Sequence, residues 1–272
     1  MGKIGVFDSG YGGLTVLKEI QATLPNYNYL YLGDNARAPY GDRSFDLVHE
    51  FTLQAVKFLF KNDCPLVILA CNTSSAKALR NIQQNYLIKF APEKKVLGVI
   101  RPSTEEIGNL TKTKCIGILG TKGTIESNSY LIELNKFFPE VKVYQHACPL
   151  WVPLIENGLH QTPEGLSIIK KDVDILMKKN QSIDTLVLAC THYPIVEHII
   201  KRHLGKSVKI VSQGKLVARK LKDYLERHPE IEVELSKGSE KKYLTTENQE
   251  VFDKQSEILL GSKIKSTQVL LI

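Results

Sequence analysis

Residues 67–73 read Val67-Ile68-Leu69-Ala70-Cys71-Asn72-Thr73, a short apolar run that ends at a thiol and two polar side chains. The pattern returns as Leu186-Val187-Leu188-Ala189-Cys190-Thr191-His192, in which the second cysteine lies 119 positions after the first. A second pair of matching stretches, residues 4–10 and 116–122, has a spacing of 112 residues. Two nearly equal spacings indicate that the chain consists of two similar halves, which we expect to join near residues 92–98.

Segments with helical spacing alternate with these β-rich runs. Ser44 and the pair Thr162-Pro163 are typical helix starts, because a hydroxyl caps free backbone N–H groups and proline suits the first helical turn. Such alternation is typical of βαβ units around parallel strands. We therefore expect an α/β fold of two similar domains with parallel sheets, related by a pseudo-twofold axis, with the active site in the cleft between them.

The expected domain limits follow from the repeat. The first domain comprises residues 1–95 together with 210–272, and the second comprises residues 96–209. The tail of the first domain includes a charged, turn-rich stretch at 226–242 and then a helix at 247–260. We expect this tail to fold back on the first half.

The composition is that of an ordinary globular protein. The chain has 272 residues, of which 43% are hydrophobic and 24% charged, which argues against disorder and against a coiled coil. Its apolar runs stop well short of the roughly 20 residues that cross a bilayer. An acid, Asp8, follows the first apolar run too soon for a signal peptide, so we expect a cytoplasmic protein.

Five cysteines, at positions 64, 71, 115, 148 and 190, include no C-x-x-C pair, and the seven histidines include no H-E-x-x-H motif. An odd number of scattered cysteines favours free thiols over a disulfide framework. The sequence therefore favours a mechanism without a metal. Cys64, Cys115 and Cys148 do not follow a strand in the way that the other two cysteines do, and we assign them to packing.

The net charge of +7 is modest, but basic residues cluster between Lys201 and Lys222, where eight Lys or Arg residues occur without an acid. Such a stretch could contact nucleic acid or a protein partner. The ordinary interpretation is a solvated face balanced by acids elsewhere in the fold. We favour this second interpretation and expect neither a nucleic-acid nor a membrane partner.

The two repeated cysteines are the strongest chemical feature. At a strand-to-helix turn, backbone N–H groups lower a thiol pKa from its usual value of about 8.5, so that a thiolate becomes accessible. A cleft between the halves would place Cys71 and Cys190 on opposite sides of a bound molecule. Two acid–base groups in this arrangement can remove a proton from one face of a carbon and return one to the other face, which inverts its configuration.

An acyl-transfer enzyme is the alternative use of the same residues. Cys190, His192 and Asp8 could form a Cys-His-Asp site, but Cys71 would then have no role. The glycine turn at residues 8–13 does not match a nucleotide-binding motif, since Thr15 stands where G-x-G-x-x-G requires its last glycine. We expect Ser9 in this turn to contact an anion.

Two further stretches are candidate site loops. Residues 33–41, Gly33-Asp34-Asn35-Ala36-Arg37-Ala38-Pro39-Tyr40-Gly41, are too polar for a core and are expected to lie over the same sheet edge. Glu156-Asn157-Gly158 either belongs to the site or simply ends a helix with glycine.

Together these motifs resemble the bacterial glutamate racemases. The resemblance rests on D-S-G-x-G-G at residues 8–13, D-N-A-R-x-P-Y-G at 34–41, C-N-T-x-S-A at 71–76, E-N-G at 156–158 and C-T-H-Y-P at 190–194. It spans about residues 3–215. The sequence departs from the family at residues 211–214, which read Val-Ser-Gln-Gly where I-[DS]-S-G is usual.

The resemblance implies a cofactor-independent, two-base interconversion of L- and D-glutamate that supplies D-glutamate for peptidoglycan, and a homodimer. It implies that Cys71 acts on the α-proton of the D-enantiomer with help from Asp8. Cys190 would act on that of the L-enantiomer with help from His192 and Glu156. The implied substrate-binding residues are Asp8, Ser9, Pro39, Tyr40, Gly41, Asn72, Thr73, Thr121, Thr124, Thr191 and His192. A sister racemase that acts on aspartate or a hydantoin would share both thiols and differ around Pro39.

Overall fold

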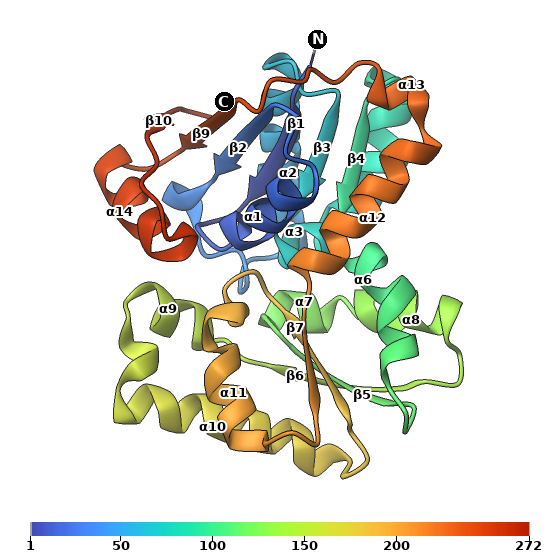
Figure 1. Ribbon diagram of the computed structural model, residues 1–272, viewed down its shortest axis with the longest axis vertical. Coiled ribbons are helices and arrows are strands. Elements are labelled where there is room, and N and C mark those ends of the chain that lie inside the picture. Colours follow the sequence, from blue (N-terminus) through green and yellow to red (C-terminus); the bar gives the residue numbers. More distant parts are fainter. Residues whose placement is uncertain (1, 272) are drawn as a thin grey trace.

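Two parallel β-sheets form the framework of the computed structural model, which describes residues 2–271 (Figure 1). The first sheet has six strands in the order β10-β9-β2-β1-β3-β4, and the second has four in the order β6-β5-β7-β8. Every pair of neighbouring strands is parallel. The predicted α/β fold with parallel sheets is therefore confirmed.

The strands and helices alternate along the chain. The strands are β1 Ile4–Asp8, β2 Tyr29–Gly33, β3 Leu66–Leu69, β4 Lys95–Gly98, β5 Cys115–Gly120, β6 Lys142–Ala147, β7 Thr185–Ala189, β8 Lys209–Ser212, β9 Lys241–Thr245 and β10 Ser266–Gln268. The longer helices are α1 Gly13–Thr23, α2 Phe45–Lys61, α6 Ile100–Ile107, α8 Ser129–Phe137, α10 Pro163–Lys179, α11 Glu197–Leu204, α12 Gly214–Arg227 and α14 Gln249–Leu260. The shorter ones are α3 Asn72–Lys77, α4 Leu79–Asn81, α5 Ile88–Phe90, α7 Lys122–Glu126, α9 Trp151–Glu156 and α13 Pro229–Glu232.

The two sheets share one strand order, as the internal repeat predicts. Strands β2-β1-β3-β4 of the first sheet correspond in order to β6-β5-β7-β8 of the second. In such sheets the connections change direction between the first and third strands, and ligands bind outside the carboxyl ends of the strands at this point. Here β1 and β3 flank that point in the first sheet, and β5 and β7 flank it in the second.

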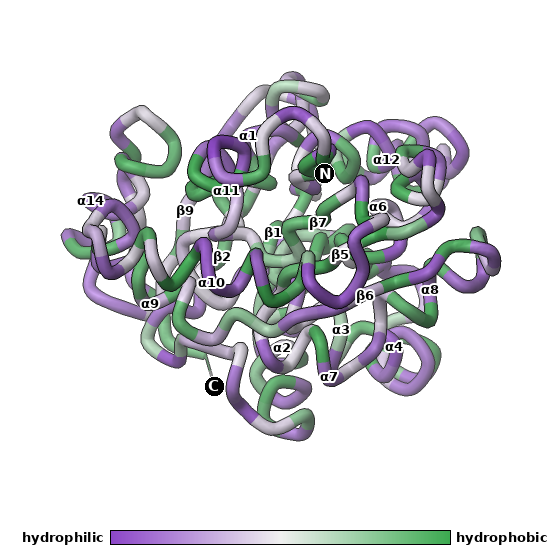
Figure 2. The backbone as a smooth tube through the Cα atoms, turned by 90° about the horizontal axis from the view of Figure 1, so that it is seen from below, coloured by the Kyte–Doolittle hydropathy of each residue, from purple (hydrophilic) through white to green (hydrophobic). Residues whose placement is uncertain are grey.

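Side-chain caps and apolar stripes explain why the helices begin and pack where they do. The Ser44 side chain accepts a hydrogen bond from the backbone N–H of Leu47 at 3.3 Å, and that of Thr162 accepts one from Gly165 at 3.1 Å. Both predicted helix starts are thus confirmed. Hydrophobic and hydrophilic residues alternate along α10 and α12, as expected for helices with one buried face (Figure 2).

The tail folds back on the first half, as predicted. Strand β9 pairs with β2, with Tyr29 opposite Lys241, and β10 extends the sheet beyond it. Helices α12 and α14 both pack against α1. Within the described residues, no helix is long and apolar enough to span a membrane.

Each sheet includes a strand that extends a few residues beyond the domain limit expected from the sequence. Strand β4 extends to Gly98 in the first sheet because it pairs with β3, and β8 extends to Ser212 in the second because it pairs with β7. The division at residues 95 and 210 into two folding domains stays a prediction.

Candidate active site

A small pocket lies at the carboxyl ends of the strands and draws its walls from both halves of the chain. Twelve of the residues expected from the sequence line it: Ser9, Pro39, Tyr40, Gly41, Cys71, Asn72, Thr73, Thr121, Glu156, Cys190, Thr191 and His192. Asp8 and Thr124 are not part of its wall, but each contacts a residue that is. Segments that are far apart in the sequence therefore meet at one cavity.

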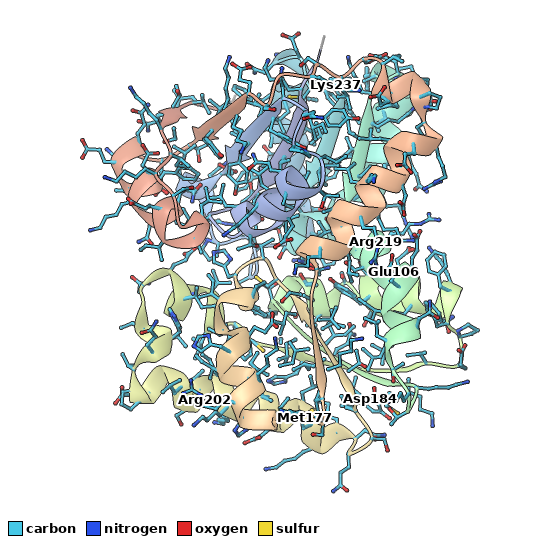
Figure 3. The ribbon with its side chains drawn as sticks, viewed as in Figure 1. Glu106, Met177, Asp184, Arg202, Arg219 and Lys237 are labelled. Carbon is cyan, nitrogen blue, oxygen red and sulfur yellow. The ribbon has the colours of Figure 1, made fainter. Side chains whose placement is uncertain are left out.

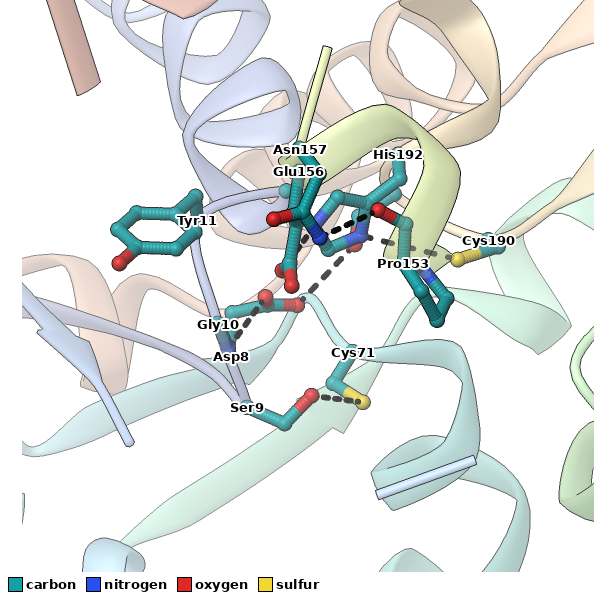
Figure 4. A network of polar contacts seen from close by, with 12 residues as sticks. Asp8, Ser9, Gly10, Tyr11, Cys71, Pro153, Glu156, Asn157, Cys190 and His192 are labelled. Carbon is teal, nitrogen blue, oxygen red and sulfur yellow. Dashed lines mark hydrogen bonds and ion pairs between the residues drawn. The ribbon is translucent and has the colours of Figure 1, made fainter. Parts of the chain in front are cut away.

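Cys71 lies at the junction between β3 and α3. Its sulfur accepts a hydrogen bond from the backbone N–H of Ser74 at 3.4 Å, which makes it the cap of α3. A second hydrogen bond, of 3.3 Å, joins the sulfur to Ser9 Oγ (Figure 4). Burial and the charge of nearby Asp8 nevertheless raise the pKa of the Cys71 thiol to about 11, so the protonated form is favoured here.

Asp8 ends β1 and is buried behind the pocket. Its Oδ2 accepts a hydrogen bond from the backbone N–H of Gly10 at 3.0 Å, and its Oδ1 accepts one from Thr191 Oγ1 at 3.4 Å. Burial raises the pKa of this carboxyl, although the charge of His192 and these hydrogen bonds oppose the rise. Asp8 thus links the first half of the chain to the second and places a proton-accepting group beside Cys71.

Cys190 ends the equivalent strand, β7, but has an imidazole for a neighbour. His192 Nδ1 lies 3.9 Å from Cys190 Sγ, and His192 Nε2 lies 2.9 Å from Glu156 Oε1 (Figure 4). Burial lowers the pKa of His192, but the contacts with Cys190 and Glu156 together outweigh it and raise the pKa to about 10. The imidazole next to the Cys190 sulfur is therefore protonated, and positively charged, at neutral pH.

Glu156 fits both interpretations of its motif. Helix α9 ends at Glu156, and Gly158 follows with a φ of 70°, a left-handed conformation that favours glycine. The helix end also directs the Glu156 carboxylate toward His192. The acid that orients the imidazole is therefore Glu156 and not Asp8, so the Cys190-His192-Asp8 alternative is wrong about the acid.

The glycine turn of the first half contacts the cysteine loop of the second. A Cβ atom on Gly12 would lie 2.4 Å from Thr191 Oγ1 and 2.6 Å from His192 Nδ1, so no larger residue fits without a shift. Beside it, Thr15 Oγ1 donates a hydrogen bond to the carbonyl of Thr191 at 3.0 Å. These contacts hold the His192 loop against the start of α1.

Hydroxyl groups close another part of the pocket. Thr73 Oγ1 is 2.9 Å from Thr121 Oγ1, which in turn hydrogen bonds Thr124 at 3.0 Å and caps α7. In the 33–41 loop, Tyr40 is buried and its hydroxyl hydrogen bonds Asp34. Thr73 and Thr121 thus bring hydroxyl groups from both halves to the pocket wall, where Tyr40 also lies.

Sequence reasoning missed several pocket residues. Lys122 follows Thr121 in the repeated stretch and brings a cation to the rim, whereas Pro149, Val152 and Pro153 form an apolar wall at the start of α9. Lys122 could have been found from the repeat, since residues 116–122 match residues 4–10. No pattern distinguishes the apolar wall from ordinary core residues.

Four of the eight basic residues between Lys201 and Lys222 form ion pairs. Lys201 contacts Glu197, Arg219 contacts Glu106, Lys220 contacts Glu105 at 3.3 Å, and Lys222 contacts Glu226 at 4.0 Å. Figure 3 shows Arg219 on α12 facing Glu106 on α6. The predicted balance by acids is confirmed for these four residues.

One cluster of potential metal ligands, which sequence spacing did not predict, lies behind α9. His146, Cys148 and Asp172 have ligand atoms within 4.8 Å of one another. The carboxylate of Asp172 also hydrogen bonds the Trp151 indole at 2.8 Å and lies 3.0 Å from His146 Nε2. These contacts tie the end of β6 to α10 and support the wall of the pocket.

Comparison with known proteins identifies the family. A family model described as Asp/Glu/Hydantoin racemase matches residues 4–221. Glutamate racemase 2 of Caldanaerobacter subterraneus subsp. tengcongensis is 38% identical over 261 residues, which cover 96% of this chain and 94% of that protein.

Solved structures agree with the sequence comparison. The glutamate racemase isoform RacE1 from Bacillus anthracis superposes with a TM-score of 0.90 at 37% identity, covering 99% of this chain and 98% of that one. The glutamate racemase from Francisella tularensis subsp. tularensis, solved in complex with D-glutamate, has a TM-score of 0.87 at 32% identity and covers 99% and 98%. The chain therefore belongs to the glutamate racemases of the Asp/Glu/Hydantoin racemase family, which are isomerases.

Proposed function

We propose that this chain interconverts L- and D-glutamate by a two-base mechanism in which Cys71 and Cys190 exchange protons with the α-carbon. One observation carries the proposal: the two thiols end equivalent strands of the two sheets and line the same pocket. The family relationship supports the substrate, since the Francisella relative was solved with D-glutamate.

The charges around the two sulfurs suggest how a turnover starts. Cys190 beside protonated His192 begins as the thiolate, and Cys71, with its pKa of about 11, begins as the thiol. With L-glutamate, the Cys190 sulfur takes the α-proton and the S–H of Cys71 gives its proton to the opposite face of the carbanion. The product is D-glutamate, with a thiol on Cys190 and a thiolate on Cys71, and the reverse reaction restores the starting forms.

Each thiol has its own assisting groups. After the forward step, the Cys71 thiolate accepts hydrogen bonds from Ser9 and from the N–H of Ser74. For the reverse reaction Asp8, whose pKa is raised by burial, can accept the S–H proton of Cys71, which forms the thiolate and removes the carboxylate charge that would repel it. His192, held by Glu156, serves Cys190 by supplying a positive charge.

The remaining pocket residues suit a substrate with two carboxylates and one ammonium. Such a ligand needs hydroxyl, amide and charged groups rather than an apolar cavity. Ser9, Asn72, Thr73, Thr121, Thr124, Thr191 and His192 would hold it from both halves, together with Asp8 and the loop segment Pro39-Tyr40-Gly41. Proton transfer between thiols and carbon needs no cofactor, and we propose none.

We further propose that the product D-glutamate supplies peptidoglycan synthesis and that the enzyme acts as a homodimer. The cytoplasmic location expected from the sequence likewise stays a prediction. Both the role of the product and the assembly are those implied by the family.

The test is proton NMR of L-glutamate with the purified protein in D2O, with no cofactor or metal added, followed by chiral analysis. We expect the α-proton signal to disappear while deuterated D-glutamate accumulates. Exchange of L-aspartate but not of glutamate would overturn the substrate assignment. If neither amino acid exchanges, the two-base proposal fails.

A further inference from the structure

A ring of three buried hydrogen bonds lies beside the pocket. Asn72 Nδ2 donates to Gln213 Oε1 at 2.7 Å, Gln213 Nε2 donates to the hydroxyl of Tyr130, and that hydroxyl donates to Asn72 Oδ1 at 2.7 Å. The exposed fractions are only 2%, 4% and 0% for Asn72, Gln213 and Tyr130. Water therefore does not compete for these groups, and an unpaired group here would be costly.

A backbone carbonyl fixes the direction of the whole ring. Gln213 Nε2 also lies within hydrogen-bonding distance of the carbonyl of Val99, at 3.3 Å, and of Ser103 Oγ, at 3.0 Å, so its two N–H bonds are shared among three acceptors. A carbonyl only accepts hydrogen bonds, so Gln213 must turn its nitrogen toward Val99 and its oxygen toward Asn72. Asn72 must then present its nitrogen to Gln213 and its oxygen to Tyr130.

This orientation determines what Asn72 offers to a ligand. Its oxygen and one of its two N–H bonds are engaged in the ring, which leaves the second N–H. Asn72 lines the pocket next to Cys71. A substrate carboxylate only accepts hydrogen bonds, so it would be attracted by this N–H and repelled by the oxygen of a flipped amide.

We propose that Gln213 and Tyr130 are positioning residues, which hold the Asn72 amide with its free N–H toward a substrate carboxylate. The inference rests on the proposed function, because it assumes that the pocket binds glutamate. Gln213 occupies the turn between β8 and α12, where the sequence departs from the motif usual in the family.

The ring also joins segments from both halves of the chain, so it stays intact only if the two halves keep their relative position. Asn72 begins α3 behind the first sheet, Tyr130 belongs to α8 beside the second, and Gln213 lies where the chain returns from the second sheet to α12. The bonded partners are far apart in the sequence: Tyr130 and Asn72 by 58 residues, Asn72 and Gln213 by 141, and Gln213 and Tyr130 by 83. Correct orientation of Asn72 therefore depends on both halves.

The test compares Tyr130→Phe with the matched control Tyr29→Phe. Tyr29 is also buried and its hydroxyl donates one hydrogen bond, to the carbonyl of Leu24 at 2.6 Å, but it does not line the pocket. Both variants should melt at lower temperature than the parent. Only Tyr130→Phe should raise KM for L- and D-glutamate, by about tenfold, with kcat within about twofold, because a hydrogen bond to a bound carboxylate acts on binding.

Gln213→Leu provides a second variant, and calorimetric titration with D-glutamate provides a second measurement. Gln213→Leu should weaken D-glutamate binding at least as much as Tyr130→Phe. If both variants keep the KM and Kd of the parent and only their melting temperature falls, the positioning role is overturned. The proposed function then still stands, provided that the parent protein racemises glutamate. If the parent neither binds nor racemises glutamate, both proposals fail.

Discussion

The turn that carries Cys71 and the turn that carries Cys190 have the same place in their sheets but opposite electrostatic surroundings. Cys71 follows β3 and Cys190 follows β7, the corresponding strands of the two parallel sheets, and both cysteines are buried at the edge of one pocket. Cys71 has a carboxylate nearby and hydroxyl and N–H groups on its sulfur. Cys190 has an imidazole that a glutamate holds in place.

The difference shows how a duplicated unit acquires a division of labour. Burial and repulsion by Asp8 raise the pKa of Cys71 and favour its thiol, whereas the imidazole beside Cys190 has a raised pKa and carries a positive charge at neutral pH. In a symmetric pair either thiol could carry the shared proton, so neither direction of proton transfer would be favoured at the start. The asymmetry comes from neighbours and not from the cysteines themselves.

Replacing either thiol removes one of the two acid–base groups and should have the largest effect on racemisation. We expect Cys71→Ser and Cys190→Ser each to lower racemisation by roughly 10³-fold or more, since a hydroxyl is a far weaker acid than a thiol. Exchange of the α-proton with D2O should survive for L-glutamate only in Cys71→Ser and for D-glutamate only in Cys190→Ser. Cys115→Ser, at a buried cysteine outside the pocket, is the matched control and should retain turnover within about twofold. Normal turnover in either active-site variant contradicts the pairing.

Replacing the neighbour of either thiol should slow one direction of proton transfer more than the other. We expect His192→Asn to slow removal of the L-glutamate α-proton, and Asp8→Asn to slow that of the D-enantiomer, each by roughly 10²-fold. Primary deuterium isotope effects measured separately with α-deuterated L- and D-glutamate report which step has become limiting. Equal isotope effects in the two variants would show that the neighbours do not distinguish the thiols.

Gly12 tests whether the Cys190 turn depends on close contact with the first half. A methyl group in Gly12→Ala would collide with Thr191 and His192 and displace the imidazole. We expect kcat to fall about tenfold and the free energy of unfolding to fall by about 1–3 kcal/mol, as is usual for overpacking. Gly238→Ala, whose Cβ would lie 3.1 Å from Asn28 Oδ1 away from the pocket, serves as control. An active Gly12→Ala enzyme would mean that the loop adjusts freely.

The smallest expected effect is on the pH dependence of activity, where His192→Asn should shift the decline at alkaline pH. The pKa of His192 is raised from 6.5 to about 10, so its stabilisation of the folded state is complete below pH 6.5 and is lost as pH rises through about 10. Activity toward L-glutamate should decline in the same range, because the charge beside Cys190 disappears. In His192→Asn the residual activity should decline only as the Cys71 thiol ionises, near its pKa of about 11. A profile of kcat/KM against pH checks this, and identical limbs in both proteins would exclude His192 as the group responsible.

Much of the framework could be predicted from the sequence because it depends on local patterns. The strands that end at Cys71 and Cys190 are short and apolar, and the caps Ser44 and Thr162 act through neighbours three residues away. The repeat placed both cysteines at equivalent strand ends, from which a shared pocket followed. For the same reason most pocket residues could be anticipated from motifs that follow strands.

What could not be predicted depends on contacts between distant residues. Strand β9 has lysines at 241 and 242 and reads as a charged turn, yet it becomes a strand because β2 offers it a free edge. Trp151 shows no local motif either, yet its indole donates a hydrogen bond to Asp172 of another helix. Gln213 and Tyr130 show no local motif, because their function arises only where three segments meet.

The topology also implies an order of assembly during synthesis. The second sheet is built entirely from residues 115–212, a continuous stretch that can form as soon as it has left the ribosome. The first sheet starts earlier but is completed later, since β2 must wait for β9, with Tyr29 opposite Lys241. Its unpaired edge is exposed while the whole second sheet is being made, so this edge is the part of the nascent chain most open to wrong pairing or to a chaperone.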